Sequence, residues 1–292
     1  SLIANVMDGV GEPSLIIEDS TSPHSFTLKP SHAKLLEEAD LIFWVGEGIE
    51  TFMERPLESI VKNAEVVEFM EVESIEKLKF REESIYGEHD DHDDHDDHDD
   101  HDEDHDGHDD HDDHDDHAGH EGHNHGEFDA HIWLDPMNAK EMVREIAHEL
   151  GHLDPTNKDK YEANADATIL ALDQLIEDVS KDINKDAKFV VFHDAYQYFE
   201  ERFGVRAAGA LTLNTDVLPG AKQIDEIQDV IKDRGINCIF SEPQFNPKII
   251  STIAEDTNIK TGVFDPLGAN INSDKDLYFK LISNLGKELK GC

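Results

Sequence analysis

The stretch TNKDKYEANADATILALDQLIEDVSKDIN, residues 156–184, decides how this 292-residue chain is organised. Its apolar side chains recur every three or four residues, at Tyr161, Ala165, Ile169, Leu172, Ile176, Val179 and Ile183. This spacing places them on one face of a single helix, and the preceding Asp154-Pro155 is a start signal because proline fits the first helical turn. Such a helix extends roughly 40 Å at about 1.5 Å per residue. We therefore expect a rigid helix, within residues 154–187, that links two lobes.

Short apolar runs alternate with helical patterns on both sides of this helix. In the first lobe, residues 1–153, we expect strands at 15–17, 39–46 and 64–68 and helices at 31–39, 50–62 and 136–151. In the second lobe, residues 188–292, we expect strands at 189–192, 237–240 and 261–264 and helices at 195–202, 221–234, 247–256 and 277–289. Ser31 and Asp194 are the expected N-caps of their helices. The alternation predicts an α/β fold with a parallel sheet flanked by helices in each lobe.

An insertion of unusual composition interrupts the first lobe between residues 88 and 129. It holds twenty-two acidic residues, no Lys or Arg, and thirteen of the nineteen histidines, with Asp-Asp-His as its repeating unit. This composition cannot form an apolar core, so we expect the run to be solvated and disordered. Imidazole and carboxylate suit zinc. We predict auxiliary metal binding by His89, His92, His95, His98, His101, His105, His108, His111, His114, His117, His120, His123 and His125.

The period of three in this run indicates how tightly it binds metal. In an extended polyproline-type chain, successive histidines lie on one edge, roughly 9 Å apart. Two neighbours then share an ion only if the chain bends, and bending lowers the conformational entropy. We therefore expect several weak, exchangeable sites that concentrate zinc.

The charge of the chain limits the classes of partner. The formal net charge is −43, of which the histidine-rich run carries −22 and the rest −21. An acidic surface repels nucleic acid and anionic lipid and attracts cations. No apolar stretch reaches eighteen residues, so we expect no transmembrane segment. An amphipathic helical pattern begins at Leu2 and no signal peptide is visible, so we expect an exported chain whose signal segment has been removed.

Three histidines outside the run lie where open α/β sheets present ligands, in loops near strand ends. His24 follows the first expected strand, His131 begins the segment after the run, and His193 ends the strand at 189–192. Asp265 occupies the matching place after the strand at 261–264. The ordinary alternative is that each histidine is a solvated loop residue and that Asp265 is a turn residue. If they converge, the metal lies between the two lobes.

The remaining histidines and the two cysteines have less specific interpretations. His148 and His152 are spaced i, i+4 but do not form a His-Glu-x-x-His motif, and we expect a solvated helix end. His32 is expected on the surface in the first turn of its helix. Cys238 and Cys292 do not form a Cys-x-x-Cys pair, so the residues alone leave a disulfide and two free thiols open.

Several motifs, in order, resemble the solute-binding proteins of metal ABC transporters, and in particular the periplasmic zinc-binding proteins among them. The resemblance covers nearly the whole chain and rests on SPHSF (22–26) with LKPS (28–31), ADLIFWVG (39–46), HIWLDP (131–136), FHDAY (192–196), SEPQF (241–245) and DPLG (265–268). A charged, histidine-rich loop before the second ligand motif is also typical of these zinc-binding proteins.

The resemblance implies a site, a cargo and a partner. It implies three imidazole ligands at His24, His131 and His193, a disulfide between Cys238 and Cys292, and a bound zinc ion. Asp265 matches a carboxylate ligand of manganese-type relatives, whereas Pro23 stands where some zinc members have a glutamate, so the fourth ligand is Asp265, water or an imidazole of the run. The resemblance further implies a periplasmic monomer that delivers zinc to a membrane permease.

Two other functions compete with transport. Three histidines and an open coordination position also describe a hydrolytic zinc enzyme, for which Glu242 is the one candidate base in the sequence. A storage protein would use the histidine-rich run alone, which leaves the ligand set outside the run unexplained. We expect a carrier that is not an enzyme.

Overall fold

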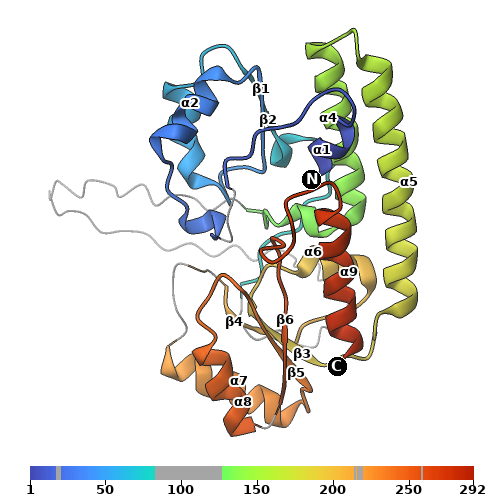
Figure 1. Cartoon of the computed structure of the whole chain (residues 1–292). Helices are drawn as coiled ribbons and strands as arrows, with labels where there is room; N and C mark the ends of the chain where they lie inside the picture. Colours follow the sequence, from blue (N-terminus) through green and yellow to red (C-terminus); the bar gives the residue numbers. More distant parts are fainter. Residues whose placement is uncertain (18–20, 83–126, 214, 216–219, 258) are drawn as a thin grey trace, which may run out of the picture. The chain divides into compact units, whose positions relative to one another are not determined.

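The computed structural model describes residues 1–17, 21–82, 127–213, 215, 220–257 and 259–292 (Figure 1). The histidines expected to bind auxiliary metal, from His89 to His125, lie outside the described residues. Within the described residues, the chain is an α/β protein with parallel sheets flanked by helices, as the sequence predicts.

The first lobe is built on a pair of parallel strands. Strand β1 (Leu41–Trp44) pairs with β2 (Glu65–Glu68), with Leu41 opposite Glu65. The other elements here are α1 (Leu2–Val6), η1 (Pro23–Ser25), α2 (Pro30–Glu38), η2 (Thr51–Met53), α3 (Glu54–Ser59), η3 (Phe69–Glu71) and η4 (Ile132–Leu134). Beside the two strands, a small core buries Leu36, Ile42, Trp44 and Met53, which draws α2 and α3 onto one face of this sheet.

The second lobe contains a four-stranded parallel sheet in the order β4-β3-β5-β6. Its elements are β3 (Phe189–His193), α6 (Gln197–Phe203), β4 (Ala210–Thr212), α7 (Ala221–Asp233), β5 (Cys238–Ser241), α8 (Lys248–Thr257) and β6 (Lys260–Val263). Every residue of β3 is buried. This is expected of a central strand that helices cover on both faces, and it explains the continuous apolar run in the sequence.

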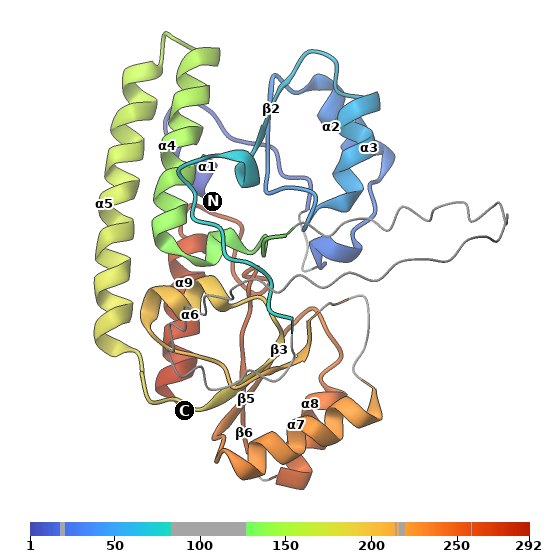
Figure 2. The same ribbon diagram turned by 180° about the vertical axis from the view of Figure 1, so that it is seen from behind.

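Three long helices complete the fold: α4 (Pro136–Leu153), α5 (Lys158–Asp182) and α9 (Leu277–Lys290). Helix α5 packs along α4 at one end and against α9 towards the other, and both views show these neighbours side by side (Figures 1 and 2). Its 25 residues correspond to about 38 Å. The predicted apolar stripe is largely confirmed, because Tyr161, Ala165, Leu172 and Val179 are buried on it.

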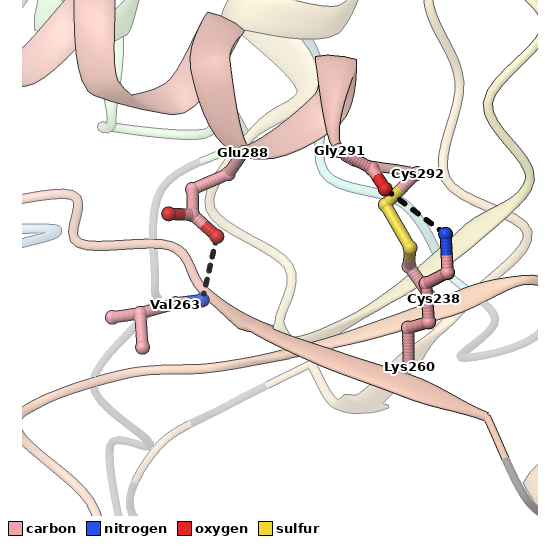
Figure 3. Close-up of a disulfide and its surroundings, with 6 residues drawn as sticks. All are labelled: Cys238, Lys260, Val263, Glu288, Gly291 and Cys292. Carbon is pink, nitrogen blue, oxygen red and sulfur yellow. Dashed lines mark hydrogen bonds between the residues drawn. A yellow bond between two sulfur atoms is a disulfide. The ribbon is translucent and has the colours of Figure 1, made fainter.

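A disulfide joins Cys238 on β5 to Cys292 after α9, as the resemblance implied (Figure 3). Two hydrogen bonds support this attachment: Lys260 Nζ donates to the Gly291 carbonyl at 3.2 Å, and Val263 N donates to Glu288 Oε2 at 3.3 Å. The C-terminal helix is therefore fastened to β5 by the disulfide and to the edge strand β6 by the two hydrogen bonds.

Four local expectations are wrong. Residues 15–17 form no strand: they pair with no strand of the described chain, and Leu15 is 50% exposed, so this short run gains little from burial. The helix predicted to start at Ser31 starts one residue earlier, with Lys29 as its N-cap and Pro30 in the first turn. Tyr196, not Asp194, is the N-cap of α6. Residues 127–129 are part of the folded chain: Phe128 forms a bridge with Lys79, and Asp129 is fully buried.

Candidate metal site

Three histidines from separate segments meet in the described chain. His24 lies on the short helix η1 and is half-buried, whereas His131, at the N-cap of η4, is 5% exposed. His193 is the last residue of β3 and is 4% exposed. One nitrogen of each ring lies within 4.8 Å of the other two. The convergence predicted from the sequence is therefore present.

Two separations among the Nε2 atoms match the edge of a zinc tetrahedron. His24 Nε2 lies 3.4 Å from His131 Nε2, which in turn lies 3.3 Å from His193 Nε2. Zinc–nitrogen bonds of about 2.0–2.1 Å with tetrahedral angles place ligand atoms about 3.3–3.4 Å apart. Both His24 and His193 therefore stand at the ligand separation of tetrahedral zinc from His131.

Buried carboxylates orient two of these rings from behind. Asp129 Oδ1 lies 2.6 Å from His131 Nδ1, and Glu242 Oε1 lies 2.6 Å from His193 Nδ1. A carboxylate accepts, so Nδ1 of each ring carries the proton and donates it, which leaves the Nε2 lone pair for the shared centre. Each carboxylate also accepts from the backbone N–H of the histidine that it orients.

The parallel sheet explains why Glu242 reaches His193. Strands β3 and β5 are neighbours, with Phe189 opposite Cys238 and Val190 opposite Ile239. The carboxyl ends of parallel strands meet at one edge, so the residue after β5 comes beside the last residue of β3. Glu242 is 3% exposed, so solvent screens its interaction with the imidazole only weakly.

These carboxylates also change proton affinities in the site. Burial lowers the pKa of His193, but the negative charge and hydrogen bond of Glu242, with smaller contributions from Asp194 and Asp129, outweigh burial and raise it above 6.5. Burial, together with the charge of Glu242, raises the pKa of the Tyr196 hydroxyl well above 10. Tyr196 therefore stays neutral and cannot act as a base beside the histidines.

A small hollow surrounds the three rings. Its free volume is about 10 Å³, and Pro23, Trp133, Phe245 and Leu267 contribute to its walls. The Trp133 ring centroid is 5.3 Å from that of His131, and Trp133 Nε1 donates to the Pro266 carbonyl at 2.8 Å. Room for about one water-sized particle beside the imidazoles suits a single ion.

Asp265 does not join the three histidines. Its Oδ1 accepts hydrogen bonds from Gln244 Nε2 at 3.1 Å, Leu267 N at 3.3 Å and Gly268 N at 2.9 Å. The carboxylate therefore closes the turn after β6, which is the alternative role considered from the sequence.

Asp129 was missed as a functional residue because it appeared to belong to the acidic run. Its Oδ2 accepts from Gln197 Nε2 at 2.7 Å, and its carbonyl accepts from the Tyr198 hydroxyl at 2.6 Å. The signal that could have found it is its place two residues before His131, next to an apolar segment.

The segment that precedes the histidine-rich run is anchored next to the site through Arg81. Arg81 Nη1 donates to Asp194 Oδ1 at 2.9 Å, and Arg81 Nη2 donates to Glu200 Oε2 at 2.6 Å. Burial raises the pKa of Glu200, and Arg81 opposes this rise. Asp194, next to the ligand candidate His193, therefore pairs with a cation instead of capping α6.

His148 and His152 are exposed near the end of α4, as predicted for a solvated helix end. With Glu149 they form a second group whose candidate ligand atoms lie within 4.8 Å of one another. His32 Nδ1 accepts from Lys29 N at 3.2 Å, so this ring caps the start of α2. None of the helices in the described ranges combines the length and apolar character needed to cross a bilayer.

A protein-family model and named relatives match the whole chain. The family model described as zinc-uptake complex component A, periplasmic, matches residues 1–292. The high-affinity zinc uptake system protein ZnuA of Brucella abortus (strain 2308) is 49% identical over 100% of this chain and 88% of its own length. The protein of the same name from Yersinia pestis is 34% identical over 100% of this chain and 87% of its own length.

Solved structures share the fold. A crystal structure of ZnuA superimposes with a TM-score of 0.73 at 21% identity and covers 98% of this chain and 94% of its own. The laminin-binding adhesin Lmb of Streptococcus agalactiae has a TM-score of 0.71 at 25% identity, covering 99% of this chain and 95% of its own. With the family model matching from end to end, this chain belongs to the family of periplasmic zinc-uptake complex component A proteins.

Proposed function

We propose that this protein binds one zinc ion through His24, His131 and His193 in the periplasm and delivers it to the membrane permease of an ABC transporter. The observation that carries the proposal is the spacing of the Nε2 atoms, 3.3 and 3.4 Å, which is the ligand separation of tetrahedral zinc. Family membership supports the transport role, because relatives bear the name high-affinity zinc uptake system protein.

The donor set selects the class of cation. Imidazole nitrogen favours zinc, copper and nickel over magnesium, calcium and manganese, which prefer oxygen ligands. Asp129 and Glu242 accept from Nδ1 of His131 and His193, which keeps each Nε2 lone pair available to the cation. The carboxylates thus strengthen nitrogen ligation without supplying the oxygen donors that hard cations require.

For the fourth ligand, the geometry favours water over Asp265. The Asp265 carboxylate would have to give up hydrogen bonds from Gln244, Leu267 and Gly268 to turn towards the ion. A water molecule needs no such rearrangement.

Loading and release require one ligand to move, and His24 is the candidate. It lies on a three-residue helical turn and is half-buried, whereas His131 and His193 are buried and held by carboxylates. On the basis of the exposure and the short turn of His24 alone, we propose that the permease displaces its loop, while the lobes, residues 1–153 and 188–292, stay held by α5. The histidine-rich run serves in this proposal as a weak collector that raises the local zinc concentration.

A hydrolytic role is disfavoured by the position of its only suggested base. Glu242 Oε1 accepts from both Nδ1 and the backbone N–H of His193, so this oxygen is already engaged in orienting a ligand. We therefore propose a carrier and not an enzyme. A hydrolase assay on the zinc-loaded protein tests this point.

Metal stoichiometry and affinity test the proposal. Competition titration with a chelator should give one tight zinc ion per chain for a variant that lacks residues 89–125. His193→Ala should abolish that tight binding whether the run is present or absent, and circular dichroism should show that the variant is folded. Tight binding that persists in folded His193→Ala, or that disappears with the run alone, would overturn the assignment in favour of a storage protein.

A further inference from the structure

The C-terminal end of α4 carries a second set of metal-ligating side chains. The ring centroids of His148 and His152 are 4.2 Å apart, with the ring planes tilted by 50°. Glu149 Oε1 lies 3.6 Å from His148 Nε2, and one ligand atom from each of the three residues lies within 4.8 Å of the others. Zinc ligands stand about 3.3 Å apart, so side-chain rotation alone closes the difference.

One carboxylate oxygen of Glu149 is buried without a hydrogen-bond donor among the described residues. The residue is 9% exposed, and its Oε2 is buried without a hydrogen bond from any residue in the described part of the chain. Burial raises the pKa of Glu149, and the carboxylate of Glu65, at the start of β2, raises it further by its charge and by close approach of its side chain. Two carboxylates have no proton to donate to each other, so they share a proton or a cation.

The surroundings favour a cation. Helix α4 ends at Leu153, and the C-terminal end of a helix carries a partial negative charge. The remainder of the chain, outside the histidine-rich run, is acidic as well. Two imidazoles and a carboxylate form a donor set that zinc takes in proteins, with a fourth position left for water or a further carboxylate.

We propose that His148, Glu149 and His152 form a second binding site for a borderline divalent cation such as zinc, with Glu65 beside it. The site is open to solvent, because the His148 side chain is 58% exposed. It is therefore expected to exchange zinc faster and to bind it more weakly than the three-histidine site. The inference does not depend on the transport role, since it rests on the local geometry of α4 and β2.

Diffraction at the zinc absorption edge tests the position directly. Crystals of the full chain grown or soaked with zinc should show an anomalous peak bounded by His148, Glu149 and His152, and His148→Ala/His152→Ala crystals should lose that peak only. Both imidazoles are exposed, so the double variant is expected to fold. The proposal fails if saturating zinc gives no such peak, or if a peak appears only where a neighbouring molecule supplies a ligand.

Glu149→Gln gives a second test, because it should stabilise the metal-free protein and weaken zinc binding. Without metal, the substitution removes the conflict with Glu65 and should raise the melting temperature. With zinc, it removes a ligand. Loss of a group that merely hydrogen-bonds a ligand weakens binding about 10–100-fold, so the anomalous peak should require at least about 100-fold more zinc.

Asp166→Asn is the control, because it removes an exposed carboxylate from the neighbouring helix α5 without removing a proposed ligand. It should leave both the apo melting temperature and the zinc peak close to those of the parent protein. Metal-free Glu149→Gln that is less stable than the parent, or that binds zinc as well as the parent, contradicts the proposal.

Discussion

The two histidine groups of this protein use the same ligand type in different surroundings. His131 and His193 are 5% and 4% exposed, and a buried carboxylate accepts a hydrogen bond from Nδ1 of each ring. His148 and His152 are exposed at the end of a helix, and the neighbouring carboxylate, Glu149, is itself a candidate ligand.

This difference shows where affinity comes from in a metal site. At the three-histidine site, the carboxylates fix the tautomer and the ring orientation before metal arrives, so binding requires little ordering. At the α4 site, the imidazoles must give up rotational freedom in solvent, which opposes binding. The first arrangement is suited to tight capture, and the second to weak exchange.

The largest expected effect follows loss of a ligand at the buried site. His24→Ala should weaken tight zinc binding by more than about 100-fold, because removal of a ligand exceeds the loss expected for a supporting hydrogen bond. His24 is half-buried on a short turn, so the fold should survive. Chelator competition measures the affinity, and His32→Ala is the control. If the two variants bind zinc equally well, His24 is not a ligand and the three-histidine site is not the tight site.

Glu50 is a half-buried carboxyl that accepts from backbone N–H groups, whereas Glu242 accepts from an imidazole as well. Glu50 Oε2 accepts from Val45 N and Gly46 N, and burial raises its pKa to about 7. Between pH 4.5 and about 7, the folded chain keeps a proton that the unfolded chain has lost. Stability therefore falls as pH rises through this window, by up to about 3 kcal/mol for this group.

Glu50→Gln should remove this part of the pH dependence while keeping an acceptor for the two backbone N–H groups. Urea unfolding from pH 4.5 to 8 measures the change, and Glu58→Gln, exposed on α3, provides the control. Parallel stability curves for Glu50→Gln and the parent protein would show that Glu50 ionises normally.

The supporting carboxylate should have an intermediate effect. Glu242→Gln keeps the shape of the side chain but replaces the charged acceptor of His193 Nδ1–H. We expect zinc affinity to fall about 10–100-fold, the range for groups that orient metal ligands. Glu58→Gln, the same substitution on the exposed side of α3, is the control and should leave zinc affinity unchanged. Unchanged affinity in Glu242→Gln would mean that the orienting hydrogen bond is unimportant.

The smallest expected effect is at Asp265. Asp265→Asn retains an acceptor oxygen for the backbone N–H groups of Leu267 and Gly268, so the turn should persist. If water is the fourth ligand, zinc affinity should change by less than about tenfold. A larger decrease, measured by the same competition titration, would identify Asp265 as a ligand.

Much of this architecture was predictable because its signals are local. The apolar stripe of α5 follows from helical periodicity, and strand β3 from a short apolar run, so both could be located without knowledge of their neighbours. The wrong strand at residues 15–17 shows the limit of this approach. Whether an apolar run becomes a strand depends on a pairing partner, which lies elsewhere in the chain.

By itself, the sequence determined the α/β class, the long helix, the disulfide partners through the family resemblance, and the candidate ligands His24, His131 and His193. Only the tertiary structure decided which carboxylates support these ligands. Asp129 and Glu242 come beside their imidazoles through buried packing and the adjacency of β3 and β5. The physical reason is that periodicity is encoded within one segment, whereas a hydrogen bond between segments distant in sequence depends on how the whole chain packs.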